Sequence, residues 1–386
     1  MFKTLLSKLR RMDWLMTACV FALIVMGTVF IWSSGSARQS VSLQTIWVTH
    51  AYTAVCGLAI YFACALFDYR KLLNWLATPI YAVSLVLLVV VLVFGAKVYG
   101  GRRWLWFFQP SEVSKLAVLL FVAHLFGRMG RESFRWFMAG LLVVGAPALL
   151  ILAEPDLGTA LALVPAVLAM LLAARVWTKG LVAILLAGLL AMGAVLGTVY
   201  VAEGKTDVDQ RARIYSYLPL REHQLKRLRV FLFPDRDITN TGYNLRQAQI
   251  SIGSGSMWGK GLKKGEQKSL GYLPPSVSMN DFIFAVLAEE SGFMGALSML
   301  ALFLGILLSG IRIAFTSDDD RGRLFVVGAT TLVFCHLYIN VAMSIGLMPI
   351  TGLPLPFISA GRTFLIVLLA MLGVVQSVAV HREVEE

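Results

Sequence analysis

Ten apolar runs, each about as long as a membrane-crossing helix, constrain this chain more than any other feature of its sequence. They lie near 14–34, 46–66, 73–95, 112–128, 136–153, 158–174, 179–201, 280–312, 323–346 and 362–380. A helix needs about 20 mainly apolar residues to cross the hydrocarbon core of a bilayer. Of the 386 residues only 15% are charged, whereas about a quarter are charged in a typical soluble domain. The sequence therefore predicts an all-α polytopic membrane protein with a single transmembrane domain over 1–386.

The basic residues between the runs predict how the chain crosses the membrane. They gather in alternate connections, at 3–11, 70–71, 128–135, 175–179, 312–323 and 382. Connections rich in Lys and Arg stay on the cytoplasmic side, so we expect both termini to be cytoplasmic. The first run is followed by no clear cleavage pattern, and we expect it to be retained as a span. The longest connection, 202–279, then lies outside the cytoplasm, between spans seven and eight.

The net charge of +12 indicates an anionic partner. Because the charges flank apolar spans and form no soluble patch, an anionic lipid or a phosphate fits better than a nucleic acid. The four cysteines all lie within apolar runs, and the five histidines are scattered. The sequence therefore indicates neither a disulfide framework nor a metal cluster.

The 202–279 connection carries thirteen Lys or Arg and seven Asp or Glu, a net charge of +6. Aromatic and amphipathic stretches interrupt these charges, which suits a segment lying on a membrane surface over anionic headgroups; the alternative is a solvated loop. Residues 253–261 are rich in Gly and Ser but match neither the GxxxxGK[ST] phosphate loop nor the GxSxG hydrolase pattern. We expect its backbone N–H groups, together with Lys260 and Lys263, to be able to hold a phosphate there; the alternative, which this segment alone favours, is a plain Gly/Ser loop.

Three carboxylates stand just after this connection. Ser278 and Asn280 are good N-cap residues, so the pattern predicts a helix with Asp281 in its first turn. The helix dipole favours an acidic residue there without any function, and the alternative is a functional carboxylate. Glu289 and Glu290 lie inside the apolar run, where a charge is costly. Unless they are functional, we expect them to be hydrogen-bonded to neighbouring helices.

Three further segments combine polar residues with apolar surroundings. Residues 100–115 end in Glu112 and Lys115, three residues apart on one helix; an aromatic belt with a local ion pair explains this segment without a function. Residues 154–159 place two carboxylates in a short turn that would cap the next helix. Residues 349–361 contain three prolines and predict a non-helical segment, which is tolerated at membrane depth only where protein or a wet cavity surrounds it.

Taken together, these segments resemble the shape, elongation, division and sporulation family of bacterial cell-wall polymerases, and its RodA branch more than its FtsW branch. The matching stretches follow one another in the family's order and spacing, at 103–115, 154–159, 242–261, 280–290 and 352–359. One departure follows Ser359, where the family's Tyr-Gly-Gly-Ser-Ser is replaced by Ala-Gly-Arg-Thr-Phe. This places the cation Arg362 where small polar residues are usual.

The resemblance implies a peptidoglycan glycosyltransferase of the bacterial cytoplasmic (inner) membrane that polymerises lipid II on the extracytoplasmic face and releases undecaprenyl pyrophosphate. It also implies a class B penicillin-binding protein transpeptidase as partner, among the membrane proteins of the elongation complex. Asp281 falls on the family's essential acidic residue. The expected substrate-binding residues, in the stretches quoted above, are Arg103, Glu112, Lys115, Asp156, Lys260, Lys263, Glu290 and Ser359.

In that reaction a sugar hydroxyl attacks an anomeric carbon, so the site needs a base and a sink for negative charge. We expect Asp281 to be the base in a single displacement with inversion. Lys and Arg groups, with a divalent cation such as Mg²⁺ or Mn²⁺ and no organic cofactor, would stabilise the leaving pyrophosphate. Two alternatives stay open: a lipid II flippase with an intramembrane polar pathway through Glu112, Lys115 and Glu290, and a non-catalytic scaffold of the wall-synthesis complex.

Overall fold

The computed structural model describes residues 2–36, 41–98, 101–106, 108–127, 134–154, 156–205, 207–218, 220–236 and 241–382. Within these ranges, helices occupy all ten predicted apolar runs: α2 (Trp14–Ser36), α4 (Ile46–Leu66), α6 (Ala77–Phe94), α7 (Pro110–Phe126), α8 (Phe134–Ala153), α9 (Leu157–Ala173), α10 (Thr178–Glu203), α16 (Ile283–Phe315), α17 (Asp320–Ser344) and α18 (Arg362–Val380). Eight of the described helices are long and apolar enough to cross a membrane. The prediction of an all-α polytopic membrane protein is confirmed.

The other two helices, α7 and α9, have 17 residues each. At 1.5 Å per residue they are about 26 Å long, at the short end of the range for a span. Most of α7 is buried, because α6, α9 and α17 pack around it. The charged residues of α7 therefore face protein.

Short elements join the long helices in the first half of the chain. They are α1 (Phe2–Arg10), α3 (Val41–Gln44), α5 (Tyr69–Lys71), the π-helical turn η1 (Leu72–Leu76), β1 (Ala96–Val98) and β2 (Gly101–Trp104). The helices α5, η1 and α6 run on as one continuous rod. The strands β1 and β2 form an antiparallel pair that places Lys97 opposite Arg102.

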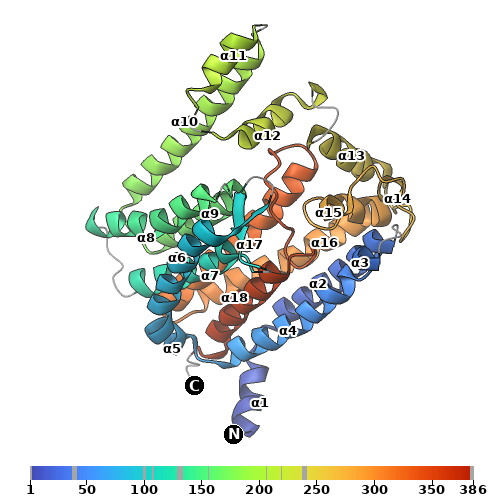
Figure 1. Ribbon diagram of the computed structural model, residues 1–386. Coiled ribbons are helices and arrows are strands. Elements are labelled where there is room, and N and C mark those ends of the chain that lie inside the picture. The colour runs from blue at the N-terminus through green and yellow to red at the C-terminus, as the bar shows by residue number, and fades with distance from the viewer. Residues whose placement is uncertain are drawn as a thin grey trace.

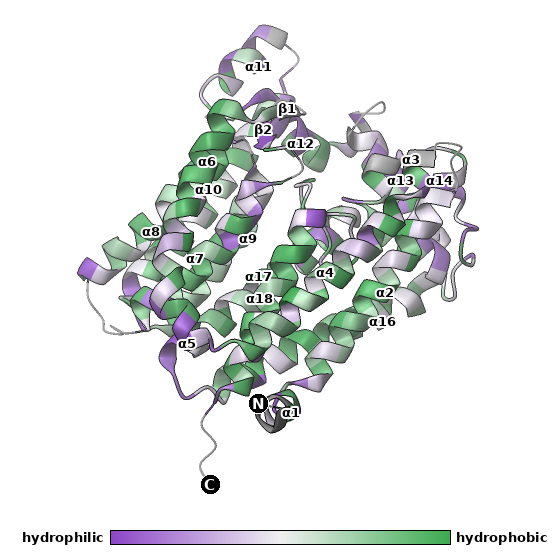
Figure 2. Cartoon of the chain, turned by 60° about the horizontal axis from the view of Figure 1, so that its bottom comes forward, coloured by the Kyte–Doolittle hydropathy of each residue, from purple (hydrophilic) through white to green (hydrophobic). Residues whose placement is uncertain are grey.

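The long helices run between two polar ends. Figure 1 shows α1 and the last turn of α18 at one end of the bundle and α11 to α15 at the other. Figure 2 shows hydrophobic ribbon along the long helices and hydrophilic ribbon around α5, β1 and β2. The helices α10 and α11 project away from the rest of the bundle (Figure 1), and only 6% of the apolar window of α10 is buried.

The predicted 202–279 connection is mostly helical where it is described. It contains α11 (Val208–Tyr215), α12 (Glu222–Leu232), the 3₁₀ turn η2 (Pro234–Arg236), α13 (Thr241–Ser254), α14 (Glu266–Ser269) and α15 (Pro275–Ser278). An apolar cluster that includes Val230, Leu245 and Phe282 packs α12 and α13 against the start of α16 and the 345–361 segment. This connection is therefore part of the fold.

The structure corrects the sequence-based placement of Asp281. We predicted Ser278 and Asn280 as helix caps and Asp281 in the first helical turn. Instead, Ser278 ends α15, and Asp281 lies in a turn two residues before α16, whose N-cap is Phe282. The prediction failed because the Pro-Pro pair starts a short helix of its own, and the chain must turn before α16 begins. The predicted break at 349–361 is confirmed, since α17 ends at Ser344 and α18 begins at Arg362.

Candidate active site

The turn that carries Asp281 is held by hydrogen bonds from two distant segments. Asn340 of α17 donates from Nδ2 to the Asp281 carbonyl at 3.0 Å and to the Leu353 carbonyl at 2.8 Å. Ser359 donates from Oγ to the Asn280 carbonyl at 2.7 Å and accepts from the Leu355 N–H at 2.8 Å. These contacts fix the backbone of the turn against the non-helical 345–361 segment.

The carboxylate of Asp281 and the guanidinium of Arg227, on α12, approach the same glycine. A Cβ atom at Gly352 would lie 3.7 Å from both Asp281 Oδ2 and Arg227 Nη2. Gly352 has a φ of +76°, which a residue with a side chain adopts only at a cost. Arg227 is oriented by donating from Nη1 to the Thr351 carbonyl at 2.7 Å. The acid and the cation therefore face one small volume beside Gly352.

Burial gives Asp281 an unusual pKa. Desolvation raises the pKa of its carboxyl from 3.8 to about 6, although the positive charges of Arg227 and Arg103 act in the opposite direction. No hydrogen bond or ion pair within the described residues occupies its carboxylate oxygens. A carboxylate with a pKa near neutrality and free lone pairs can accept a proton from a bound ligand.

Two further carboxylates, those of Glu154 and Asp156, lie close to these cations. Arg103, on β2, donates from Nε to the Glu154 carbonyl at 3.0 Å. Asp156 is the N-cap of α9 and accepts from Thr159 N at 3.2 Å and from Thr159 Oγ1 at 2.9 Å; the prediction that this turn caps the next helix is confirmed. Burial and, to a smaller extent, the charge of Asp156 raise the pKa of Glu154 to about 8, although the charge of Arg103 acts in the opposite direction. Arg227 interacts electrostatically with Asp281, Arg103 and Asp156, so these four groups form one charged assembly.

Glu112 and Lys115 form a buried ion pair on α7. Lys115 Nζ lies 2.7 Å from Glu112 Oε2 and 3.1 Å from His336 Nε2 of α17. The ring of His336 stacks on Phe364 with centroids 4.7 Å apart, and Lys115 Nζ lies 4.9 Å from the Phe364 ring. One helical turn beyond His336, Asn340 holds the Asp281 turn, so α17 connects the ion pair to the candidate base.

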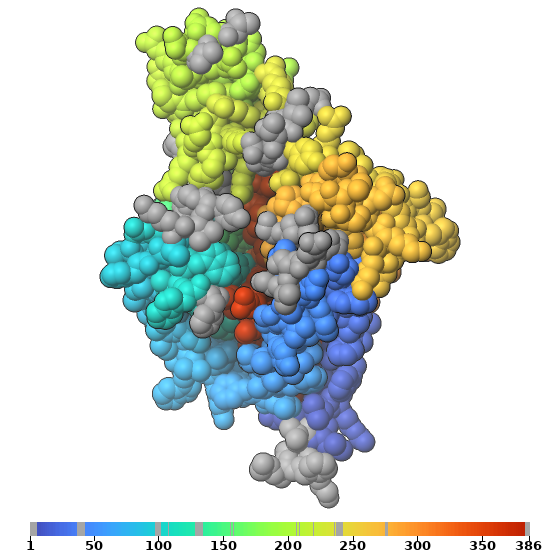
Figure 3. Space-filling view, turned by 45° about the vertical axis from the view of Figure 1, so that its right-hand side comes forward, coloured from blue at the N-terminus to red at the C-terminus, as the bar shows by residue number. Residues whose placement is uncertain are grey.

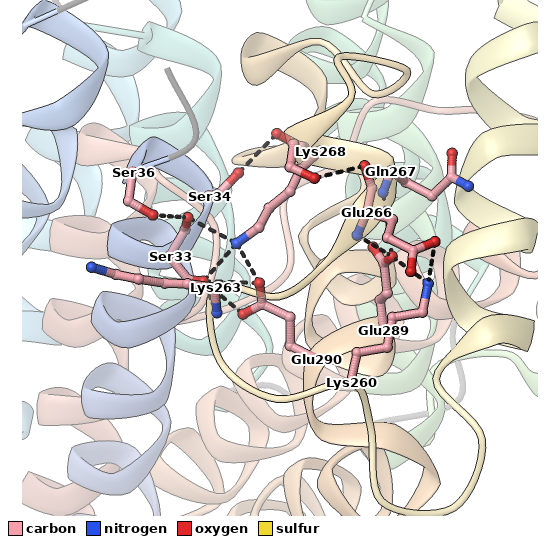
Figure 4. A network of polar contacts seen from close by, with 12 residues as sticks. Ser33, Ser34, Ser36, Lys260, Lys263, Glu266, Gln267, Lys268, Glu289 and Glu290 are labelled. Carbon is pink, nitrogen blue, oxygen red and sulfur yellow. Dashed lines mark hydrogen bonds and ion pairs between the residues drawn. The ribbon is translucent and has the colours of Figure 1, made fainter. Parts of the chain in front are cut away.

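Lys260, Lys263 and Glu290 belong to a different cluster, drawn in Figure 4. Lys260 Nζ lies 3.0 Å from Glu289 Oε1, and Lys268 forms an ion pair with Glu290. Ser33 of α2 donates from Oγ to Glu290 Oε2 at 2.7 Å. The expectation that Glu289 and Glu290 are hydrogen-bonded by neighbouring segments is met. Lys263 Nζ sits 3.5 Å from the centroid of the Trp32 ring.

Backbone N–H groups of the Gly/Ser segment 253–261 donate hydrogen bonds to carbonyl groups of α16. Lys260 N donates to the Glu289 carbonyl and Gly261 N to the Glu290 carbonyl, both at 3.0 Å. The segment crosses α16 at a kink at Gly292, where φ is +68° and a Cβ atom would lie 2.3 Å from Gly259 N. The two N–H groups are therefore not available to a phosphate in this conformation. Substrate binding by the Lys260 and Lys263 side chains stays a prediction.

A cavity of about 290 Å³ adjoins the Asp281 turn. Met279, Asn280 and Arg362 line it together with His50 and Ile46 of α4. Figure 3 shows red C-terminal chain at the floor of a furrow beside the blue N-terminal segments. The side chain of Arg362 is exposed, so the cation that departs from the family pattern faces this cavity.

The structure thus brings together Asp281, Arg103 and Asp156 and connects Glu112 and Lys115 to them through α17. Ser359 is 2% exposed and supports the backbone of the Asp281 turn. Sequence reasoning missed Arg227 and Asn340. Arg227 is one of several cations in the basic Lys226 to Arg229 stretch and nothing singles it out, whereas Asn340 is an amide inside an apolar span, which is a usable signal.

Comparisons with known proteins agree with this architecture. The family model for the FtsW, RodA and SpoVE cell cycle proteins matches residues 13–384. The chain is 32% identical over 381 residues to the peptidoglycan glycosyltransferase MrdB of Escherichia coli strain K12, covering 96% of this chain and 94% of that protein. It is 28% identical over 423 residues to the peptidoglycan glycosyltransferase RodA of Treponema pallidum, covering 95% and 97%.

Two solved structures have the same fold. The rod shape determining protein RodA of Thermus thermophilus matches with a TM-score of 0.68 and 25% identity, over 97% of this chain and 98% of that chain. A chain from a peptidoglycan synthase complex, studied for the coordination of polymerization and crosslinking, matches with a TM-score of 0.74 and 26% identity, over 96% and 98%. From its motifs, its helices and these matches, the chain belongs to the FtsW/RodA/SpoVE family.

Proposed function

We propose that this chain is a peptidoglycan glycosyltransferase that joins the disaccharide units of lipid II into glycan strands. The observation that carries the proposal is the environment of Asp281. Its carboxylate has a pKa near 6, has no hydrogen-bond partner within the described residues and lies in the field of two arginines. The names of the related proteins support the same activity.

In the proposed reaction the acceptor hydroxyl oxygen bonds to the anomeric carbon of the donor while the bond from that carbon to the pyrophosphate oxygen breaks. Asp281 takes the hydroxyl proton, and the pyrophosphate leaves with the bonding electron pair. A base with a pKa near 6 is about nine-tenths ionised at pH 7 and still holds the proton well enough to assist its transfer. One base and one departing group give a single displacement with inversion at the anomeric carbon.

Arg227 and Arg103 would stabilise the charge that develops on the pyrophosphate. Arginine is suited to this role because its planar guanidinium can donate two parallel hydrogen bonds to phosphate oxygens. No group of three or more His, Cys, Asp or Glu side chains able to hold a metal occurs within the described residues. Mg²⁺ sites often use one or two carboxylates and complete their ligands with phosphates and water. Such a cation would be held mainly by the pyrophosphate oxygens and water and would supply charge neutralisation, which leaves the Asp281 carboxylate to act as base.

The orientation and the partner belong to the same proposal. The turn that carries Asp281 joins α15 to α16, and α15 lies toward the end of the bundle opposite α1 (Figure 1). If the termini are cytoplasmic, as the basic connections favour, the site faces outward at the level of the outer leaflet of the bacterial inner membrane. Lipid II would reach it from that leaflet with its undecaprenyl chain between helices. We also propose a class B penicillin-binding protein as partner, which the likeness to a chain of a peptidoglycan synthase complex supports.

One observation favours a flippase as the second candidate. Glu112, Lys115 and His336 form a buried polar group inside the helix bundle, and intramembrane ionisable residues often mark transport pathways. A flippase would move lipid II across liposome membranes and would make no glycan. The polymerase has the opposite pair of properties.

The experiment is glycan synthesis from purified lipid II by the wild-type protein, alone and with its transpeptidase partner. Asp281→Asn keeps the side-chain size and removes the base, and we expect the rate to fall about 100-fold or more. Asp209→Asn, which removes an exposed carboxylate from α11, is the matched control and should keep full activity. Equal rates for the Asp281→Asn variant and the wild type would refute the assignment of the base. If the wild type with its partner makes no glycan but translocates lipid II, the protein is a flippase. If it does neither, the result favours a scaffold.

A further inference from the structure

A basic cavity lies at the outer end of α10, apart from the Asp281 turn. It has a volume of about 720 Å³, and its charged lining consists of Glu203, Lys205, Arg211, Arg229 and Arg236. Glu203 ends α10, Arg211 lies on α11 and Arg229 on α12. Arg236 lies on η2, so four segments bring four cations and a single anion around one hollow, and the lining keeps a net charge of about +3 at neutral pH.

Glu203 is shared by several of the donors around it. Arg229 Nε lies 3.2 Å from Glu203 Oε1, and Arg236 Nη1 lies 2.9 Å from Glu203 Oε2. Tyr215 donates a further hydrogen bond to Glu203 Oε1 at 2.6 Å. Each guanidinium carries about five N–H donors, whereas one carboxylate offers about four lone pairs. The side chain of Glu203 is only 9% exposed while that of Arg236 is 57% exposed, so the anion is buried under cations that still face the cavity.

The surroundings of the cavity suit a lipid. The apolar side chains Leu189, Leu190, Tyr200 and Val201 of α10 are exposed, with exposed fractions from 57% to 74%. Figure 2 shows α10 as a largely hydrophobic ribbon. A chain that lies along this helix would end at its Glu203 end, where a headgroup meets the cavity. An anionic headgroup with several oxygens matches three arginines.

We propose that this cavity binds the phosphate group of a membrane lipid from the leaflet at this end of the bundle. Two sources share this chemistry: a phospholipid such as phosphatidylglycerol and a polyprenyl diphosphate. The lipid's oxygens add acceptors that Glu203 alone does not supply. Bound there, the lipid joins α10, α11 and α12 and holds the projecting α10 to the connection that carries Arg227. This site is independent of the proposed polymerase reaction, because it shares no residue with the Asp281 assembly.

Lipid retention tests the proposal. The full-length protein is placed in nanodiscs that contain equal amounts of phosphatidylcholine and phosphatidylglycerol, and retained lipids are counted by native mass spectrometry; separate samples contain undecaprenyl diphosphate or inorganic phosphate. We expect the wild type to retain phosphatidylglycerol or undecaprenyl diphosphate over phosphatidylcholine, and retention to weaken with salt. Whichever of these two lipids is retained is the natural source of the phosphate group. Retention of inorganic phosphate only, or equal retention of all lipids, would overturn the proposal.

Two opposite changes separate binding from folding. Arg229→Gln with Arg236→Gln should lower retention about tenfold, which corresponds to about 1.4 kcal/mol. Arg213→Gln with Arg246→Gln is the matched control, because both arginines are exposed in the same connection and line no part of the cavity. Glu203→Gln removes the internal competitor and should raise retention about threefold or more. If Glu203→Gln lowers retention, or if the two double variants behave alike, the cavity does not bind a lipid phosphate.

Discussion

Loss of the Lys268 ammonium should destabilise the fold far more than loss of an exposed lysine from the same loop. Lys268 and Glu290 are each 2% exposed and form a buried ion pair. Lys268 Nζ also donates to the Ser33 carbonyl at 2.8 Å and to Ser33 Oγ at 2.6 Å. The Lys268→Met variant would leave Glu290 as a buried carboxylate whose remaining donor within the described residues is the Ser33 hydroxyl, at 2.9 and 2.7 Å.

Breaking a buried pair on one side typically costs about 3–5 kcal/mol. Because the Ser33 hydroxyl still reaches both oxygens of Glu290, we expect the lower end, about 3 kcal/mol or roughly a hundredfold in the ratio of folded to unfolded protein. The measurement is equilibrium denaturation in detergent followed by tryptophan fluorescence. Lys264→Met is the matched control, since Lys264 is an exposed lysine in the same loop, and it should change stability by about 0.5 kcal/mol or less.

The double variant Lys268→Met with Glu290→Gln tests the reasoning. It removes both charges and keeps an amide for Ser33, so most of the lost stability should return, as a coupling energy of about 2 kcal/mol. The same variant tests the prediction that Glu290 binds substrate, because a stable double variant with normal glycan synthesis would contradict it. If Lys268→Met is as stable as Lys264→Met, the buried ion pair does not hold the loop to α16.

Four further predictions concern the candidate active site. The rate of glycan synthesis should rise with pH through about 6 and then level off, because Asp281 must lose its proton to act as base; a flat profile from pH 5 to 8 would count against it. Folding raises this pKa from 3.8, so the folded state binds the proton more tightly, and the contribution of Asp281 to stability is present below about pH 4 and is lost as the pH rises through about 6. Asn340→Ala should lower kcat about tenfold with a smaller change in KM, since Asn340 positions the Asp281 turn; an equal change in both would indicate another role. Chelation with EDTA should stop synthesis, and Mg²⁺ or Mn²⁺ should restore it, whereas a rate that EDTA leaves unchanged would refute the divalent cation.

The membrane-crossing helices were predictable because the bilayer imposes both length and composition. All ten predicted runs became helices, and the break at 349–361 followed from its prolines. The contacts around Asp281 were not predictable in this way. Arg227 meets the Thr351 carbonyl across 124 residues, and Asn340 meets the Asp281 carbonyl across 59. Pairings at such separations depend on the packing of α12 and α17, for which a single sequence carries no local signal.

The Gly/Ser segment 253–261 shows why local composition does not predict whether backbone N–H groups are free to bind a ligand. Its composition predicted free backbone N–H groups near Lys260, but the kink at Gly292 lets the segment cross α16 and donate to the Glu289 and Glu290 carbonyls. Glycine served close packing at this crossing: a Cβ atom at Gly259 would lie 2.2 Å from the Glu290 carbonyl oxygen. Glycine can thus serve either to expose backbone N–H groups to a ligand or to allow two segments to pack closely, and the fold determines which of the two applies.

Satisfied and unsatisfied charges separate the structural cluster from the candidate site. Lys260 and Lys268 pair with Glu289 and Glu290, so a ligand that took either cation would have to break a buried ion pair and bear its cost. Asp281 is different, because no hydrogen bond or ion pair within the described residues occupies its carboxylate. In the same part of the chain, the Arg227 side chain donates a hydrogen bond to the Thr351 carbonyl alone. A ligand that carries both a hydroxyl and a pyrophosphate would supply what each of these two groups lacks. Binding energy is therefore available at the Asp281 turn without loss of an existing pair, which is why we propose that the chemistry takes place there and not among the more numerous lysines of the loop.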